Sequence, residues 1–351
     1  MTKTQQINLS VAFTLVASLV LMASPSLAQT AAPITDAETL VPRLANGRPD
    51  LQGVWDYRTS TPLERPIELG DKAVLTVEEA AAYEAQVAAT QVDREPPPGQ
   101  VGGYNQFWLD QGTNVIEGRR TSLLFDPPNG RLPATVAGAV RQVGSYGADL
   151  PSDRPIRYRG GGIRPDSHED RGLAERCLLG FNSGPPVIPG GYNQNIQVFQ
   201  TSDYVVLFHE MVHDTRIVPM GDRPHLADDI RQWMGDSRGY WDGDTLVIET
   251  TNFTDKILSF NDSLTSGMGT GATLHLTERL RRVDADTLEY EFTINDPTVF
   301  TRPFSGMIPM KKNSDPVYEY ACHEGNYGLP DILAGARVEE QALGATITGS
   351  R

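Results

Sequence analysis

The sequence predicts a mainly β protein, an antiparallel barrel or sandwich that follows an N-terminal arm with one helix. From Arg119 onward, short runs rich in β-branched and aromatic residues alternate with turn residues. Two pairs of runs are separated by tight turns, at Asp242-Gly243 and at Asp284-Ala285-Asp286, which indicates hairpins. Because adjacent antiparallel strands recur along the chain, a barrel or sandwich is favoured over a βαβ fold.

The chain begins with a predicted signal peptide, residues 1–28. Lys3 precedes an apolar run from about Leu9 to Met22, and Ser26-Leu27-Ala28 then forms a cleavage-site pattern before Gln29. The apolar run is too short for a membrane-spanning helix, and no later stretch approaches about 18 uninterrupted apolar residues. We therefore expect a periplasmic or secreted protein without a membrane partner after processing.

The rest of the chain is expected to form an arm (29–118), a β-rich core domain (119–340) and a C-terminal tail (341–351). In the arm, Gly53-Val54-Trp55 starts the first strand after a turn. Thr76 is placed to cap a helix that continues to about Gln91, with two glutamates in its first turn. Pro96-Pro97-Pro98-Gly99 then prevents any continuation of the helix, so the remainder of the arm is expected to be extended.

Strands are expected throughout the core domain, separated by turn residues. The runs are Thr121–Phe125, Ile196–Thr201, Tyr204–His209, Thr215–Pro219, Leu246–Thr251, Leu274–Val283, Leu288–Ile294 and Val317–Cys322. The stretch from Ser152 to Gly191 is rich in Gly, Pro and Arg, and is expected to be a long irregular loop or lid with a short helix near Leu173–Leu178.

Composition excludes several classes of partner. The 351 residues include 45 acidic and 30 basic side chains, a net charge of −15, which argues against nucleic acid and anionic lipid. The only two cysteines, Cys177 and Cys322, form either a disulfide or two buried thiols. Neither a dinucleotide-binding G-x-G-x-x-G after a strand nor a P-loop occurs, so no cofactor is expected.

His209, Glu210 and His213 spell H-E-x-x-H, the zinc peptidase motif. That chemistry requires a helix, on which two histidines four residues apart reach one zinc ion. The run Tyr204–His209 instead predicts a strand or tight hairpin, because it is β-branched and aromatic. Residues four apart on a strand lie about 13 Å from each other, so zinc binding is kept only as an alternative.

The strand Leu274–Val283 places a carboxylate among leucines. Glu278 shares one face with Leu274, Leu276, Leu280 and Arg282, because side chains alternate along a strand. A carboxylate in such surroundings suits general acid or base chemistry. The alternative is a structural ion pair between Glu278 and an arginine inside the barrel.

Two further polar groups are candidates for proton transfer. Glu210, Asp214 and Arg216 share a strand face and are expected to form a charge cluster with His213 nearby, unless Asp214 is a turn residue. His323 and Glu324 follow the run Val317–Cys322, at a strand end where loops carry function.

Four segments carry a resemblance to a known family. They are Gly53-Val54-Trp55, the run from Gly235 to Leu246, Thr251-Asn252-Phe253, and the run from Cys322 to Tyr327. Together they resemble a family of secreted bacterial proteins, over nearly the whole mature chain. The resemblance implies a lipocalin-like β architecture, in which a G-x-W motif opens the first strand and its tryptophan closes the barrel floor. It implies no activity.

These observations favour a cofactor-independent acid/base enzyme, a lyase, isomerase or hydrolase, that acts on a small apolar or aromatic molecule. The candidate catalytic residues are Glu210, His213, Arg216, Glu278, His323 and Glu324, with Arg282 as a second candidate anion stabiliser. One alternative is a non-catalytic, lipocalin-like protein that binds such a molecule. A second alternative is an H-E-x-x-H zinc metallopeptidase.

Overall fold

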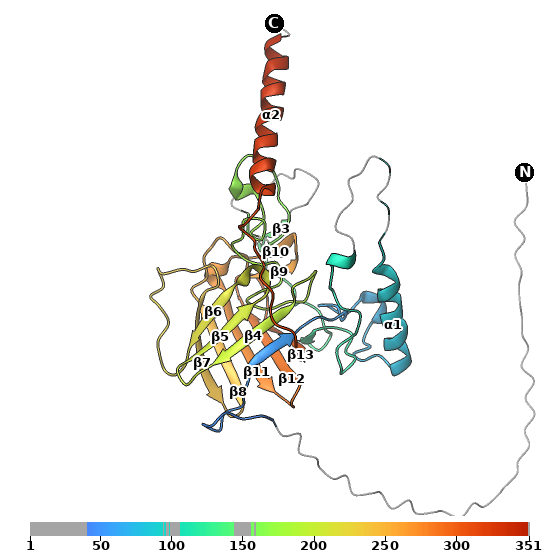
Figure 1. Cartoon of the computed structure of the whole chain (residues 1–351), viewed down its shortest axis with the longest axis vertical. Helices are drawn as coiled ribbons and strands as arrows, with labels where there is room; N and C mark the ends of the chain where they lie inside the picture. The colour runs from blue at the N-terminus through green and yellow to red at the C-terminus, as the bar shows by residue number, and fades with distance from the viewer. Residues whose placement is uncertain are drawn as a thin grey trace, which may run out of the picture. The chain divides into compact units, whose positions relative to one another are not determined.

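A computed structural model describes residues 41–349 except 94, 96–97, 99–105, 144–155 and 158. The predicted signal peptide, residues 1–28, lies outside the described residues. The described chain forms one compact unit that is mainly β, with two antiparallel sheets and two α-helices (Figure 1). The predicted mainly β fold class is therefore confirmed. None of the helices in this part of the chain combines the length and the apolar character needed to span a bilayer.

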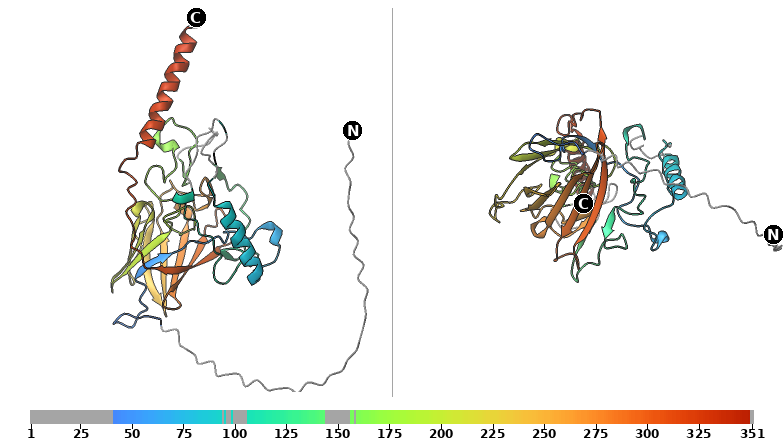
Figure 2. Two further views of the ribbon diagram at one scale, coloured as in Figure 1. Left: turned by 45° about the vertical axis from the view of Figure 1, so that its right-hand side comes forward. Right: turned by 90° about the horizontal axis from the view of Figure 1, so that it is seen from below.

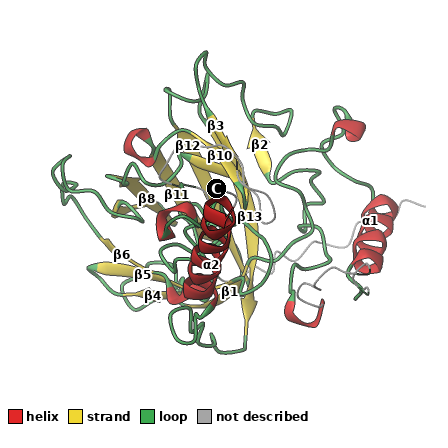
Figure 3. Ribbon diagram, turned by 90° about the horizontal axis from the view of Figure 1, so that it is seen from above, coloured by secondary structure: helices red, strands yellow, loops and turns green. Residues whose placement is uncertain are grey.

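The larger sheet has ten strands. Nine follow the order β6-β5-β4-β1-β13-β12-β11-β8-β7, and β2 pairs with β13 beside them. Figure 3 labels these strands except β7. The strands are β1 (Gly53–Asp56), β2 (Leu124–Asp126), β4 (Asn195–Gln200), β5 (Tyr204–His209), β6 (Thr215–Pro219), β7 (Asp236–Asp242), β8 (Thr245–Thr251), β11 (His275–Arg282), β12 (Thr287–Asn295) and β13 (Phe304–Asn313).

This sheet curls until its distant strands face each other. Arg216 of β6 binds Glu278 of β11, although five strands separate β6 and β11 in the sheet order. The two end strands approach at one isolated bridge, between Met220 and Gly239. No ladder joins β6 to β7 among the described residues, so a closed lipocalin barrel is not found.

The interior of the curled sheet is one hydrophobic core. Trp55 is fully buried, donates its indole N–H to the carbonyl of Leu51 over 2.9 Å, and is covered by the guanidinium of Arg282, 5.2 Å from the ring centroid. Phe292 and Phe304 are also fully buried. The G-x-W segment therefore anchors β1 within the core, as expected for the first strand.

Shorter elements surround this body. The second sheet has the order β3-β10-β9, with β3 (Arg141–Val143), β9 (Phe260–Ser263) and β10 (Ser266–Met268). The 3₁₀ helices are η1 (Ile67–Leu69), η2 (Gln106–Trp108), η3 (His168–Asp170), η4 (Met211–His213) and η5 (Gly271–Thr273), and the α-helices are α1 (Val77–Thr90) and α2 (Gly328–Gly349). The views of Figure 2 show α1 beside the sheet rather than inside it.

Helix α1 begins with the predicted cap. Oγ1 of Thr76 accepts from the N–H of Glu79, and the carboxylate of Glu79 accepts from the N–H of Thr76, which is a complete capping box. Tyr83 of α1 donates its hydroxyl hydrogen to the carbonyl of Ser60, and Gln91 donates to the carbonyl of Gly112. These bonds hold α1 against the segments that follow β1.

Several expectations are corrected by the structure. Val317–Cys322 forms no strand, and Leu173–Leu178 forms turns rather than a helix. Residues 341–349 of the predicted C-terminal tail lie in α2, and the β7–β8 hairpin has Gly243-Asp244 at its tip, one residue later than expected. Of the two alternatives for Cys177 and Cys322, the disulfide is the one that the structure shows.

Strand β13 is absent from the strands expected from the sequence, and it contains Pro309. Proline has no N–H to donate and is normally excluded from central strands. Met307 donates its N–H to the carbonyl of Leu123 on the β2 side, and the two-residue period directs the nitrogen of Pro309 to that same side. On that side, β13 pairs with β2 at Ser305 and Gly306 and with β1 from Lys311 onward, so no strand is paired with Pro309. The strand therefore tolerates Pro309 at this position.

Candidate functional site

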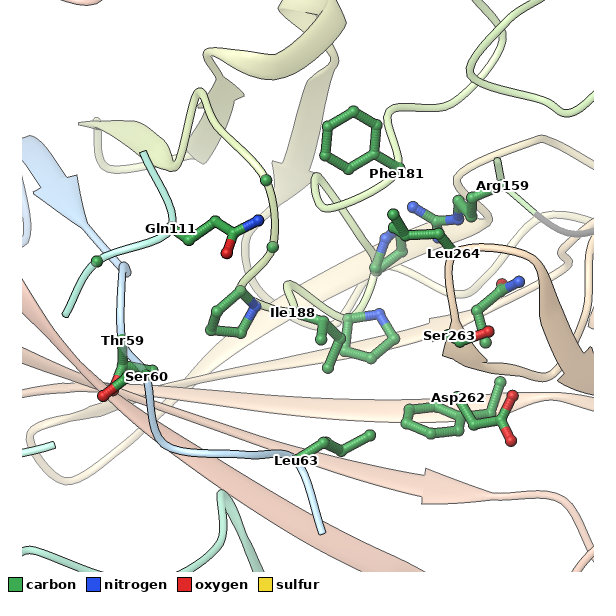
Figure 4. A pocket seen from close by; sticks show the side chains of 18 of the residues that line it. Thr59, Ser60, Leu63, Gln111, Arg159, Phe181, Ile188, Asp262, Ser263 and Leu264 are labelled. Atoms are coloured by element: carbon green, nitrogen blue, oxygen red, sulfur yellow. The ribbon is translucent and has the colours of Figure 1, made fainter. Parts of the chain in front are cut away.

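A cavity of about 530 Å³ lies among α1, the segment 181–191 and the β9 region (Figure 4). Most of its wall is apolar, with Leu63, Phe181, Pro186, Ile188, Leu258 and Phe260 among the lining residues. Thr59 and Ser60 lie at one end in Figure 4, and Arg159 lies near Phe181 and Leu264 at the other. The cavity therefore has an apolar middle and polar ends.

Arg159 is a buried cation in this wall. It is 7% exposed and donates Nη1–H to the carbonyl of Gly180 over 2.6 Å. No carboxylate of the described residues forms an ion pair with it. Burial lowers the pKa of the Arg159 guanidinium to about 10, although the nearby Asp214 and Tyr57 act in the opposite direction. At neutral pH Arg159 is therefore charged and incompletely neutralised.

The peptide group of Gly180 connects Arg159 to Asp214. Gly180 accepts from Arg159 through its carbonyl and donates its N–H to Oδ2 of Asp214 over 3.0 Å. Ser183 donates to the same oxygen over 2.6 Å, while burial raises the pKa of Asp214 above its usual value. A Cβ on Gly180 would meet Met211 and Ser183 at 2.4 and 2.5 Å, so glycine is required at this close approach. The wall around Arg159 is therefore tightly fixed.

Glu278 and Arg216, two of the predicted site residues, meet in the core. Arg216 binds both carboxylate oxygens of Glu278, with 2.8 Å between Nη2 and Oε1, and Tyr290 donates its hydroxyl hydrogen to Oε1 over 2.7 Å. The hydroxyl of Tyr290 in turn accepts from the N–H of Val187. Glu278 is fully buried and lines none of the cavities described here. The alternative of a structural ion pair is the one that the geometry supports.

His209 is the buried histidine of the H-E-x-x-H string. It is 1% exposed at the end of β5, and neither ring nitrogen has a hydrogen-bond partner among the described residues. Burial, together with the charges of Arg216 and Arg159, lowers the pKa of His209 to about 3. The imidazole is therefore neutral at physiological pH.

Glu210 and His213 follow β5 in a tight turn. Glu210 accepts from Nδ2 of Asn195 over 2.8 Å and lines a small polar pocket at the end of β4 and β13. His213 is exposed and donates Nδ1–H to the carbonyl of Tyr320 over 3.0 Å. The turn breaks the strand alternation, because Val212 has a left-handed φ of 59°. The expected charge cluster of Glu210, Asp214 and Arg216 is therefore wrong, and Asp214 is the turn residue of the alternative.

His323 and Glu324 lie in an exposed turn before α2 rather than at a strand end. Glu324 lines a shallow surface pocket with Glu175 and Glu319. The neighbouring disulfide, Cys177–Cys322, holds this turn beside η4. Of the six predicted catalytic residues, the structure therefore brings only Arg216 and Glu278 together.

Two sequence motifs, H-E-x-x-H and G-x-S-x-G, do not form the sites that they form in known enzymes. No group of three or more His, Cys, Asp or Glu side chains able to hold a metal ion occurs in the described part of the chain. His209 ends strand β5, which confirms the strand prediction, and His213 faces solvent. The run from Gly235 to Gly239 also spells the G-x-S-x-G of hydrolases, but Ser237 lies inside β7, buried and bonded to Thr250 over 2.9 Å. It is not an exposed nucleophile on a turn.

Sequence reasoning missed Arg159, the residue that best marks the cavity. It lies in a Gly- and Arg-rich segment without periodicity, where no pattern separates a buried arginine from an exposed one. Comparison with known proteins gives no function, because no family model, curated protein or solved structure matches the chain.

Proposed function

We propose that this protein binds a small, largely apolar organic molecule in the cavity beside α1. The volume of about 530 Å³ is within the range of roughly 300–1,000 Å³ that is usual for small-molecule sites. Its wall combines apolar side chains with polar groups at its ends, as small-molecule sites usually do. The apolar lining of a cavity of this size is the observation that carries the proposal.

Binding is preferred to acid/base catalysis because of where the predicted proton carriers lie. A general acid or base must come within hydrogen-bonding reach of the reacting atom. Glu210, His213, Glu278, His323 and Glu324 all lie outside the lining of this cavity. The proposal therefore keeps the small apolar ligand and places no proton transfer on it.

We also propose that the protein works in the periplasm or outside the cell. The predicted signal peptide supports this location, and so does the disulfide, because such bonds persist in oxidising compartments. The net charge of −15 continues to argue against nucleic acid or anionic lipid as a partner.

A cavity-filling variant tests the binding proposal. Ile188→Trp places an indole in the middle of the cavity, whereas Ile217→Trp adds the same group on the exposed outer face of β6. We expect neutral N-phenyl-1-naphthylamine to bind wild type and Ile217→Trp equally, and to bind Ile188→Trp at least ten-fold more weakly by fluorescence titration. Equal affinity in all three proteins would place the probe elsewhere and refute the proposal.

A further inference from the structure

We infer that the natural ligand of this cavity carries a carboxylate, which forms an ion pair with Arg159. The inference rests on the proposed binding function and adds the chemical class of the ligand. Its basis is the contrast between Arg159 and the other buried arginines of the described chain.

Each of those arginines donates at least two hydrogen bonds within the protein. Arg216 binds both oxygens of Glu278, and Arg282 donates to the carbonyls of Asp50, Asp284 and Ala285. Arg65 donates to the hydroxyl of Thr121 and the carbonyl of Pro128. None of these three arginines lines the cavity.

Arg159 makes fewer hydrogen bonds within the described chain, and it lines the cavity. A guanidinium carries five N–H donors, and only the carbonyl of Gly180 accepts from Arg159 in the described part of the chain. A neutral carbonyl does not balance a buried charge, and such a charge is costly without a counter-ion. Because Arg159 lines the cavity, an anion that enters the cavity can supply the missing partner.

Two described carboxylates near this site, Asp214 and Asp262, already have partners in the protein. Asp214 is directed at the N–H of Gly180 and the hydroxyl of Ser183, so the Gly180 peptide separates it from Arg159. Asp262, the acidic side chain in the cavity lining, pairs with Arg141 and accepts from Ser266 over 2.7 Å. Neither carboxylate competes with a ligand for Arg159.

The arrangement also orients the ligand. The carboxylate lies at Arg159, and the apolar body extends along Phe181 and Ile188 towards Leu63 (Figure 4). Carboxylate and guanidinium form two parallel hydrogen bonds, which an amide of the same shape does not reproduce. An acid and its amide therefore form a matched pair of probes.

The test uses 2-naphthylacetate and 2-naphthylacetamide with the mature protein at pH 7, by isothermal titration calorimetry. We expect wild type to bind the acid at least ten-fold more tightly than the amide. Arg159→Met should remove this preference by weakening the acid alone, and Arg159→Lys should restore part of it. Arg223→Met, which removes an exposed arginine that does not line the cavity, should leave both affinities unchanged.

The outcomes separate the two proposals. Equal affinities for acid and amide in wild type, or a preference for the acid that survives in Arg159→Met, would overturn the carboxylate inference and leave the binding function intact. Failure of both probes and of N-phenyl-1-naphthylamine to bind wild type would refute the binding function, and the inference with it. Circular dichroism of each variant confirms that the fold is retained.

Discussion

Arg216 and Arg159 are both buried, yet they serve the molecule in different ways. Arg216, in the core of the curled sheet, is 4% exposed and binds a carboxylate that the chain itself supplies. Arg159, in the wall of the cavity, is 7% exposed and has one neutral acceptor. Burial alone therefore does not distinguish an architectural cation from a recognition cation. Arg216 and Arg159 differ in whether the protein supplies the counter-charge.

The largest expected effect comes from breaking the core pair. Glu278→Gln removes the negative charge and leaves Arg216 charged in the core, which should lower the free energy of unfolding by about 3–5 kcal/mol. Chemical denaturation measures this loss. The double variant Arg216→Met/Glu278→Leu removes both charges and should recover most of it. A loss below about 1 kcal/mol in Glu278→Gln would show that the pair is not structural.

The second largest effect is expected from acid, which should lower the free energy of unfolding through His209, the buried histidine near Arg216 and Arg159. The fold holds the pKa of His209 at about 3, below the ordinary 6.5, because burial and the two guanidinium charges favour neutral imidazole. The depressed pKa contributes stability that is fully present above pH 6.5 and is lost as the pH falls from 6.5 towards 3. By pH 4.5 this loss amounts to about 3 kcal/mol.

His209→Leu isolates that contribution from the other groups that titrate in acid. The difference in unfolding free energy between wild type and His209→Leu should decrease by about 3 kcal/mol from pH 6.5 to pH 4.5. If the two proteins lose stability in parallel over this range, His209 is not held neutral by the fold.

A smaller effect is expected at the side of the cavity that α1 forms. Thr76→Ala removes the side-chain half of the capping box, at a cost of about 1 kcal/mol. Hydrogen exchange should report faster opening of Val77–Thr90, with little change in the strands. Thr90→Ala, at the last residue of the same helix, is the matched control and should have a smaller effect. Uniform acceleration across the sheet would mean that α1 and the core open together.

The smallest expected change in unfolding free energy tests most directly whether Arg159 and Arg216 have different roles. Arg159→Met removes an unpaired buried charge and one hydrogen bond, so its unfolding free energy should stay within about 1 kcal/mol of wild type. Chemical denaturation without ligand provides the measurement. A loss of about 3 kcal/mol or more would place Arg159 in the same structural class as Arg216.

The alternation of residues along one strand was enough to predict that Glu278 is buried, but not that Arg216 is its partner. The alternation of Leu274 to Arg282 places Glu278 on the buried face, which is what the structure shows. Its partner, Arg216, comes from a strand that meets β11 only because the whole sheet curls. Such a contact between distant strands leaves no periodic signal in either of them.

Other features escaped prediction for reasons of the same kind. The turn after β5 shifted the alternation, so that His209 and Arg216 face the interior together while Glu210 lies at a separate pocket. The cavity that Arg159 lines is formed by segments 59–63, 181–191 and 258–264, which are distant in sequence. A cavity formed in this way can be recognised only once its walls are assembled.

The position of β1 constrains the order in which the molecule can be made. Trp55 is synthesised early, and its strand lies between β4 and β13, where Val54 pairs with both Gln197 and Asn313. Contacts between residues so far apart in sequence slow folding, because long segments of chain must first be brought together. β1 cannot pair with β13 until almost the entire chain has been synthesised. A nascent chain that stops before β13 therefore exposes an open strand edge, the usual starting point for aggregation.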